Sequence, residues 1–439
     1  MHVTKRAFCA LSVSPTTAIC QDRVTHDTAF KGDAAVNRPL PQDPIIRRLV
    51  LQARQAQFSR RHLLQGAGVG AATLALAACA PADSSVPQAA EDISETDPTL
   101  TWSNWPAYID EDDDGAYPTL LRFQEQTGIS VEYVVDIDDN NTYYGTIKDQ
   151  LALGQPTGAD TFCVTEWMVA RLVRFGYVQD LDAANIPNKA NLAPALLNPD
   201  FDPGRNKSMP WQNGFSGLAW NTEEIPGGLK NIDDLWAPEL KGKVTVLSEM
   251  RDTMGLIMLS QGVDVSTNDW GIDEFSAALE VLEENVLSGQ IFGIKGNEYM
   301  QDFVSGDAIA AIAWSGDITV LNAEAGFEKW KFALPESGAV LWGDTFVVPL
   351  GSPRKKNAET LINYYYEPEV AAEVAAWVNY ITPVVGAQEV AAELYPEVAE
   401  NNLIFPDEAT LANSFIFRTL ETGDDQAFNG EFQRVSLGA

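Results

Sequence analysis

Apolar and polar positions from residue 99 onwards alternate between two periods, one typical of strands and the other typical of helices. Short apolar runs are followed by segments of about ten residues with helical spacing, several of which end at a glycine. This pattern predicts strands at 100–102, 130–135 and 161–164 and helices at 118–127, 142–153 and 168–175. Strands that alternate with helices of this length indicate an α/β sheet with parallel strands.

The same rhythm restarts after a Pro- and Gly-containing passage at Met209–Gly214, which we interpret as a crossing between two lobes. An apolar strand is predicted directly after this passage, at 217–220. Two groups in the second half place an indole close to a carboxylate beside a buried strand, Trp314-Ser-Gly-Asp317 and Trp342-Gly-Asp344. The other predicted elements are strands at 243–247, 308–313 and 345–350 and helices at 253–261, 272–287, 297–304, 358–366 and 370–378.

The first 78 residues have the pattern of an upstream extension followed by an export signal. Arg60 and Arg61 precede a glycine- and alanine-rich apolar run at 66–78, which is too short to be a permanent membrane span. The adjacent arginines resemble a Tat signal, and Leu76-Ala-Ala-Cys79 resembles a lipobox in which Cys79 is acylated. Residues 79–98, rich in Ser, Pro, Asp and Glu, are expected to form a disordered tether between the lipid and the fold.

Exclusion of residues 1–78 changes the composition that bears on function. All three histidines lie in the excluded segment, and the remaining 361 residues hold 19 Lys and Arg against 58 Asp and Glu, a net charge of −39. Without His, Ser–His–Asp and Cys–His catalysis and His-based zinc or iron sites are excluded. The charge argues against nucleic acid as a partner, because phosphate contacts require Lys and Arg. Most of this acidity is interpreted as an aid to solubility, and no metal or cofactor is expected.

An acidic segment at Asp110–Gly115 matches the first half of a calcium-binding loop. Leu121 stands where such a loop requires a bidentate Glu. We therefore interpret the segment as the start of a helix, where Asp side chains accept hydrogen bonds from free backbone N–H groups. A calcium site is the alternative.

Six short motifs, in this order along the chain, resemble those of the spermidine/putrescine-binding proteins of bacterial polyamine ABC importers. The resemblance covers about residues 100–417 and implies a type II periplasmic-binding-protein fold, which is two α/β lobes with a ligand cleft between them. The implied lobes are 99–214 with 343–388 and 215–342 with 389–439. The motifs are Asn104-Trp105-x-x-Tyr108, Thr165-x-Trp167, Glu249-x-x-Asp252, Trp314-x-Gly-Asp317, Trp342-x-Asp344 and Tyr380-x-Thr-Pro383.

The resemblance implies a substrate-binding component rather than an enzyme, which captures putrescine or spermidine and delivers it to a permease and its ATPase. Such a protein is expected to be a monomer in the periplasm or on the outer face of the cytoplasmic membrane, held there only by its N-terminal lipid. Aromatic rings suit the methylenes of a polyamine, and carboxylates suit its ammonium groups. The implied ligand-binding residues are Trp105, Tyr108, Thr165, Trp167, Glu249, Asp252, Trp314, Asp317, Trp342, Asp344 and Tyr380.

Several alternatives stay open at this point. Glu249, Asp252 and Asp317 would also suit helix caps, and Trp167 would also suit a cover for its own helix. Pro106-Ala107 lacks the polar groups that the family often carries there, which leaves the length and identity of the ligand open. A binding protein for a different solute, such as an amino acid derivative, thiamine or a sugar, is a separate alternative. A carboxylate-dependent glycoside hydrolase and a sensor subunit are the other candidate classes.

Overall fold

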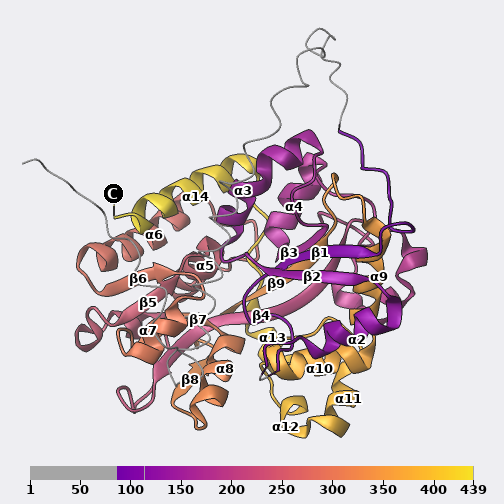
Figure 1. Ribbon diagram of the computed structural model, residues 1–439. Helices are drawn as coiled ribbons and strands as arrows, with labels where there is room; N and C mark the ends of the chain where they lie inside the picture. Colours follow the sequence, from indigo (N-terminus) through magenta and orange to yellow (C-terminus); the bar gives the residue numbers. More distant parts are fainter. Residues whose placement is uncertain (1–86, 113, 439) are drawn as a thin grey trace, which may run out of the picture. The chain divides into compact units, whose positions relative to one another are not determined.

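The computed structural model describes residues 87–112 and 114–438 (Figure 1). Contacts divide the chain into two units, residues 1–65 and 66–439, and every described residue belongs to the second unit. The predicted export signal, its adjacent arginines and Cys79 lie outside the described residues. Among the described helices, none combines the length and the apolar character that a membrane span requires.

The first lobe begins as the parallel α/β unit that the hydrophobic pattern predicts. Strand β1 pairs in parallel with both β2 and β3, and the intervening helices return the chain to the same edge of the sheet. Helix α2 has a proline in its first turn and ends at Gly128 in the left-handed conformation, which explains its bounds. The elements are β1 (Thr99–Asn104), α2 (Pro118–Thr127), β2 (Ser130–Val135), α3 (Asn140–Leu153), β3 (Thr161–Thr165) and α4 (Glu166–Phe175).

Two antiparallel strands, β4 (Ser208–Asn221) and β9 (Ala339–Val347), run through both lobes (Figure 1). The second half of β9 pairs with β3 of the first lobe, whereas the second half of β4 pairs with β7 and β8 of the second lobe. The main path of the sheet follows the order β2-β1-β3-β9-β4-β7-β5-β6. These two strands are therefore the crossing segments that the fold class requires.

This arrangement corrects two predictions of strand position. The passage at Met209–Gly214 is not a loop before a strand but the first half of β4, a single strand of 14 residues. The Trp342-Gly-Asp344 group was expected to precede a strand at 345–350, yet both side chains lie inside β9. Alternation along β9 thus decides which of its side chains lie on the cleft side of the sheet.

The second lobe repeats the α/β pattern, with β5 pairing in parallel with both β6 and β7. Most of its predicted helices and strands are present within two residues of the expected bounds. The elements are β5 (Val244–Leu247), α5 (Met250–Ser260), α6 (Ile272–Leu287), β6 (Ile291–Lys295), α7 (Tyr299–Ser305), β7 (Ala310–Trp314), α8 (Ser315–Ala325) and β8 (Trp330–Ala333).

The C-terminal third returns to both lobes. Helices α9, α10 and α11 contribute to the core of the first lobe, and α14 packs Phe428, Phe432 and Val435 into the core of the second. The elements are α9 (Lys355–Tyr365), α10 (Pro368–Val378), α11 (Ala387–Leu394), α12 (Pro396–Ala399), α13 (Glu408–Ala412), β10 (Ser414–Phe415) and α14 (Thr422–Ser436). Short 3-10 turns occupy Ala183–Asn185, Pro187–Asn191, Pro194–Leu196, Ile232–Trp236 and Pro238–Leu240.

Two separate hydrophobic cores confirm an α/β fold of two lobes. One core includes Trp102 and Phe346, and the other includes Phe275 and Ile312. The side chain of Trp314 is only partly buried and packs against both cores, which places it where the lobes meet. The lobe boundaries given above remain a prediction.

Two acidic segments have structural roles. Asp110 is buried and accepts a hydrogen bond from the backbone nitrogen of Thr119, in the first turn of α2, at 2.8 Å. The described residues contain no group of His, Cys, Asp and Glu side chains suited to a metal ion, calcium included. The described part of the predicted tether is bound to the first lobe rather than free, since the backbone nitrogen of Ile93 donates to the Pro353 oxygen at 2.8 Å.

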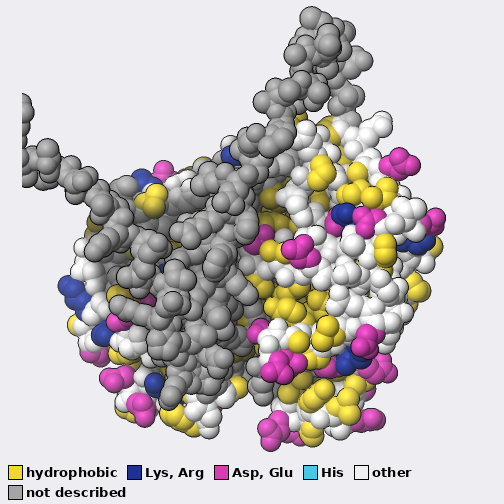
Figure 2. All heavy atoms as spheres, viewed as in Figure 1, with side chains coloured by type: hydrophobic (Ala, Val, Ile, Leu, Met, Phe, Trp, Pro, Cys, Tyr) yellow, Lys and Arg dark blue, Asp and Glu magenta, His cyan; other side chains and the backbone are white. Residues whose placement is uncertain are grey.

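Acidic side chains on the visible face of the described residues are dispersed over both lobes rather than collected in one patch (Figure 2). This distribution suits the interpretation that much of the net charge of −33 serves solubility. The carboxylates that bear on function are the buried ones described next.

Candidate functional site

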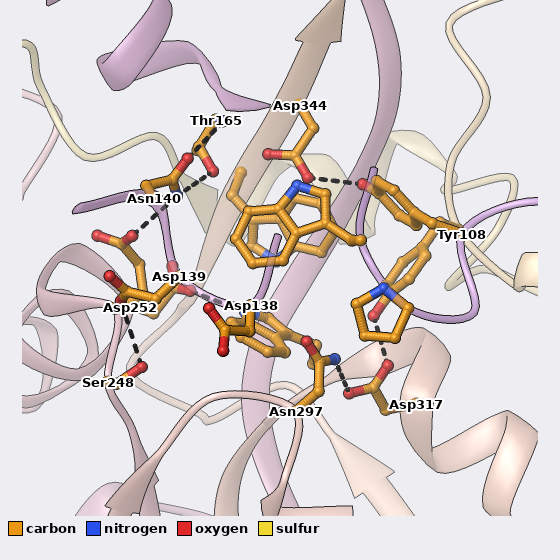
Figure 3. Close-up of a pocket in the computed structure, with 16 residues that line it drawn as sticks. Tyr108, Asp138, Asp139, Asn140, Thr165, Ser248, Asp252, Asn297, Asp317 and Asp344 are labelled. Carbon is orange, nitrogen blue, oxygen red and sulfur yellow. Dashed lines mark hydrogen bonds between the residues drawn. The ribbon is translucent and has the colours of Figure 1, made fainter. Parts of the chain in front are cut away.

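A cavity lies between the two lobes and is lined by side chains from both (Figure 3). Its walls come mainly from the carboxyl ends of parallel strands, where open α/β sheets usually bind ligands. Ten of the eleven predicted ligand-binding residues line the cavity, and these are Trp105, Tyr108, Thr165, Glu249, Asp252, Trp314, Asp317, Trp342, Asp344 and Tyr380.

The fold explains why residues so distant in sequence converge here. Trp105 follows the end of β1, Thr165 ends β3, and Trp314 ends β7. Glu249 and Asp252 lie at the start of α5, directly after β5, and Asp317 lies in the first turn of α8, directly after β7. Four of the six motifs thus lie between a strand and the helix that follows it, whereas Trp342 and Asp344 lie inside β9 and Tyr380 follows α10.

Asp344 is the first of four buried carboxylates in the cavity. Its side chain is 5% exposed, and its Oδ2 accepts a hydrogen bond from the Tyr108 hydroxyl at 2.8 Å (Figure 3). Its Oδ1 is buried and has no well-formed hydrogen bond among the described residues, although the Thr165 side chain lies close enough to lower the pKa of this carboxyl group. Burial raises the pKa of Asp344 to about 6, because the ionised form loses hydration. This carboxylate therefore has one acceptor oxygen ready for a donor from a ligand.

Asp317 differs from Asp344 because its oxygens already have partners. Tyr299 donates to its Oδ2 at 2.9 Å. Asn297 also donates to Oδ2, at 3.0 Å, and Tyr380 donates to Oδ1 at 3.0 Å (Figure 3). Burial raises the pKa of Asp317 to about 6, although these three hydrogen bonds oppose the rise. The side chain thus holds Tyr380 and Asn297 in place at the cavity.

Asp252 and Glu249 are the remaining two buried carboxylates. Trp314 donates its indole Nε1–H to Asp252 Oδ2 at 2.8 Å, and Asn140 donates its Nδ2 to Glu249 Oε2 at 3.1 Å. Burial raises the pKa of both carboxyl groups. Glu249 also accepts from the Arg251 backbone nitrogen at 3.4 Å, so it caps α5 and lines the cavity at once.

Aromatic rings form the walls between these carboxylates. Trp342 and Tyr380 lie edge to face with their centroids 5.0 Å apart, and Tyr108 meets Tyr380 at 5.7 Å. Trp105 is fixed by a hydrogen bond from its Nε1 to the Cys163 backbone oxygen at 3.0 Å. Such rings give large apolar contact area with few rotatable bonds, which suits the methylenes of a linear ligand.

Trp167 is the predicted residue that the structure does not bring to the cavity. Its ring lies instead against two guanidinium groups, at 3.9 Å from Arg251 and 5.0 Å from Arg171. Trp167 thus does not form a wall of this cavity, and its part in ligand binding stays a prediction. Its motif partner Thr165 does line the cavity, because it ends β3 while Trp167 already belongs to α4.

Six lining residues were not predicted from the sequence. Two of them, Asn140 and Asn297, make hydrogen bonds that hold other side chains of the cavity in place. Asn140 joins the lobes, since its Nδ2 donates to Thr165 Oγ1 at 2.8 Å as well as to Glu249. Asn297 donates to Asp317, and its buried Oδ1 is left without a hydrogen-bond partner among the described residues. Neutral amides at helix starts give no charge signal in a sequence. The six are Pro106, Asp138, Asp139, Asn140, Ser248 and Asn297.

The charges of the cavity have one sign. No Lys or Arg is among the described residues that line it, whereas Asp and Glu side chains approach from several sides (Figure 3). Arg251 does lie near Glu249, with 3.9 Å between Nη1 and Oε1, but it does not line the cavity. Buried carboxylates without counter-charges favour a cationic ligand, and a ligand with its own carboxylate would find no guanidinium here.

Comparisons with known proteins agree with this site. The family model for bacterial extracellular solute-binding proteins matches residues 120–405, more than half of the chain. A spermidine/putrescine-binding periplasmic protein of Salmonella typhimurium is 27% identical over 343 residues, which cover 77% of this chain and 92% of that protein. A putrescine-binding periplasmic protein of Escherichia coli is 27% identical over 364 residues, with coverage of 77% and 92%.

A solved structure leads to the same comparison. It is described as a spermidine/putrescine ABC transporter from Listeria monocytogenes, and it matches with a TM-score of 0.68 and 26% sequence identity. The match covers 78% of this chain and 100% of that chain. Together these matches confirm the resemblance that the six motifs indicate and the predicted class of fold.

Proposed function

Because the chain belongs to the family of bacterial extracellular solute-binding proteins, we propose that it captures a polyamine for an ABC importer. Putrescine and spermidine are the ligands named for its relatives. The observation that carries the proposal is the unpaired, buried Oδ1 of Asp344 in a cavity of carboxylates and aromatic rings. An ammonium group that donates to this oxygen removes an unsatisfied buried acceptor, which adds to the gain from charge pairing.

We assign the two ends of the ligand to different groups. The first ammonium donates to Asp344 Oδ1, and the methylene chain lies between the rings of Trp105, Trp342 and Tyr380. Cation–π contact with such rings contributes about 0.5–2 kcal/mol for each ammonium. The second ammonium lies toward the second-lobe carboxylates and the unpaired Oδ1 of Asn297. Asp317 acts mainly by holding Asn297 and Tyr380 in place.

The position of the cavity suggests how capture is signalled to a membrane partner. Ligand contacts would come from both lobes, so a bound polyamine favours the closed arrangement over an open one. The two crossing strands β4 and β9 are the expected hinge. A permease and its ATPase are the proposed partners, with the closed form as the species that docks, and we expect neither catalysis nor a cofactor.

The relatives support a periplasmic or extracellular location. We further propose that Arg60-Arg61 directs export and that acylated Cys79 anchors the mature protein to the membrane. These residues lie outside the described part of the chain, so this part of the proposal rests on the sequence alone. Mass spectrometry of the protein from bacterial membranes would test it, since lipid on Cys79 is expected as the new N-terminus.

Calorimetric titration against putrescine, cadaverine, spermidine and spermine tests the proposed function. We expect at least one micromolar ligand, which corresponds to about −8 kcal/mol. γ-Aminobutyrate serves as the matched control, because it keeps one amine but adds a carboxylate for which the cavity has no counter-charge. No binding across the amines, with binding of an acidic or neutral solute, would contradict the proposal.

A further inference from the structure

A carboxylate outside the cavity joins the two lobes. Asp425 lies on α14, which belongs to the core of the second lobe through Phe428 and Phe432. Its Oδ2 accepts from Arg171 on α4 of the first lobe at 2.5 Å, and its Oδ1 accepts from Arg251 on α5 of the second lobe at 2.8 Å. One side chain therefore bridges guanidinium groups that belong to different lobes.

All three charged groups are largely withdrawn from water. The side chains of Arg171, Arg251 and Asp425 are 13%, 6% and 7% exposed. Burial alone would raise the pKa of Asp425, but the two guanidiniums outweigh it and keep that pKa below its usual value. Removal of one partner from a buried ion pair of this kind strongly destabilises the arrangement, because the other charge stays buried and unpaired.

Trp167 contacts both arginines of this group. Its ring lies 3.9 Å from the Arg251 guanidinium and 5.0 Å from that of Arg171, so it makes cation–π contacts with both. A second contact between the lobes lies beside it. Asn141 of α3 accepts from Arg171 Nη1 and donates to Asn429 of α14, each at 3.3 Å.

The same group reaches the ligand cavity through Arg251. Nη1 of Arg251 lies 3.9 Å from Oε1 of Glu249, and that carboxylate lines the cavity. Nη1 itself has no hydrogen bond among the described residues, so the guanidinium acts on Glu249 by charge rather than by a fixed contact. Burial raises the pKa of Glu249, and the Arg251 charge opposes part of that rise.

We propose that Arg171, Arg251 and Asp425, here called the interlobe cluster, hold the lobes closed on the ligand, with the Trp167 ring in contact with both guanidinium groups. Separation of the lobes would take Arg171 away from Asp425 and expose the face of Trp167. The cluster thus adds to closure an energy that does not depend on ligand contacts. Its consequence for a polyamine rests on the proposed function.

Arg171→Gln is the variant that tests the cluster with least damage to either lobe. It removes the first-lobe partner but leaves the buried Arg251–Asp425 pair intact within the second lobe. We expect putrescine or spermidine, whichever binds more tightly, to dissociate about tenfold faster with little change in the association rate. Stopped-flow tryptophan fluorescence of the full chain measures both rates. Arg174→Gln, an exposed position on the same helix, is the matched control and should leave them unchanged.

A measurement without ligand separates failure of the cluster from failure of the proposed function. Spin labels at the exposed positions Glu125→Cys on α2 and Glu280→Cys on α6 report the distance between the lobes. Arg171→Gln should shift the distance distribution of the ligand-free protein toward longer values, and Arg174→Gln should not. If no amine binds the parent protein, the proposed function fails while this expectation stands.

Three outcomes would overturn the proposal. The first is an interlobe distance distribution that is the same in Arg171→Gln and the parent protein. The second is a longer distance with an unchanged dissociation rate, which would remove the role in ligand retention. The third is an equal effect of Arg174→Gln, which would mean that loss of any positive charge on α4 has the same result.

Discussion

At the scale of single residues, the site buries a carboxylate whose ionised form does not stabilise the ligand-free protein. Asp344 is buried with one oxygen unpaired, and its pKa is raised to about 6 because ionisation costs hydration. A cation offsets that cost only while it is bound. Such a carboxylate favours binding of a cation but lowers the stability of the ligand-free protein. A carboxylate that only caps a helix, by contrast, stabilises the fold.

Asp344→Asn should weaken polyamine binding by about tenfold to a hundredfold, since a hydrogen bond to a charged group contributes about 1.5–3 kcal/mol. The melting temperature of the ligand-free protein should stay the same or rise, because a buried charge is removed. Calorimetry and thermal unfolding measure the two effects. Asp269→Asn, at an exposed position, is the control. Unchanged affinity in Asp344→Asn would assign this carboxylate a structural role.

Binding should depend on pH in the direction that the raised pKa values require. Asp317 and Asp344 have pKa values of about 6, so both are increasingly protonated below that pH, while an amine with a pKa near 10 stays charged. Affinity measured by calorimetry should therefore fall as the pH drops from 8 to 5. An affinity that is constant or rises over this range would show that binding does not require Asp344 and Asp317 to be ionised.

The ligand-free protein should show the opposite trend. A carboxyl group whose pKa is raised in the folded state contributes stability that is present below its unfolded pKa of about 4 and is lost as the pH rises through about 6. The melting temperature should thus increase from pH 8 to pH 5. Asp344→Asn should reduce this increase, and an equal increase in that variant would mean that other groups cause it.

At the scale of elements, the sequence predicts helices and strands well where one face is buried and poorly where tertiary contacts decide. The helices at 118–127 and 272–287 have the predicted bounds. The first half of strand β4 was interpreted as a passage because Pro210 and Gly214 have low strand propensity. Pairing with β9, β7 and β8 outweighs that propensity, and no local pattern reports such partners.

The residues of the site also differ in how far they could be predicted from the sequence alone. Charged and aromatic residues at strand ends were found from the sequence because their chemistry is distinctive. Asn140 and Asn297 were not, since a neutral amide gains its role only from the partners that the fold brings to it. Trp167 was misplaced for a related reason, because Arg251 of the other lobe contacts its ring.

Gly214 in β4 tests the link between the crossing strand and the site. A Cβ atom at this position would lie 2.4 Å from the Trp342 ring and 2.8 Å from the Tyr380 ring, so both rings would have to move. Gly214→Ala should therefore weaken polyamine binding by about tenfold or more while circular dichroism stays unchanged. Gly227→Ala, where nothing lies within 4 Å, is the control. Normal affinity in Gly214→Ala would show that these rings do not need their present positions.

At the scale of the whole molecule, two lobes with separate cores share one cavity and are connected by β4, β9 and the segment between α11 and α14. This architecture was predicted from the resemblance of six motifs, whereas periodicity alone indicated only an α/β fold with a crossing near residue 210. The interlobe cluster could not be predicted at all, because its members are separated by up to 254 residues in sequence. Closure therefore depends on contacts that only the fold reveals.

Capture should make the molecule more compact. Addition of the tightest polyamine should lower the radius of gyration measured by small-angle scattering, because the ligand favours the closed form. A solute that does not bind in the calorimetric panel is the control and should leave the radius unchanged. Tight binding with no change in radius would argue against lobe closure as the signal to a permease.

A crystal structure of the complex with the tightest-binding polyamine tests the central claim most directly. The predicted result is an ammonium nitrogen within about 3 Å of Asp344 Oδ1, with the methylene chain between the rings of Trp105, Trp342 and Tyr380. The second ammonium should lie near Asn297 and the carboxylates of the second lobe. A polyamine bound outside this cavity, or bound with Asp344 Oδ1 still unpaired, would contradict the account.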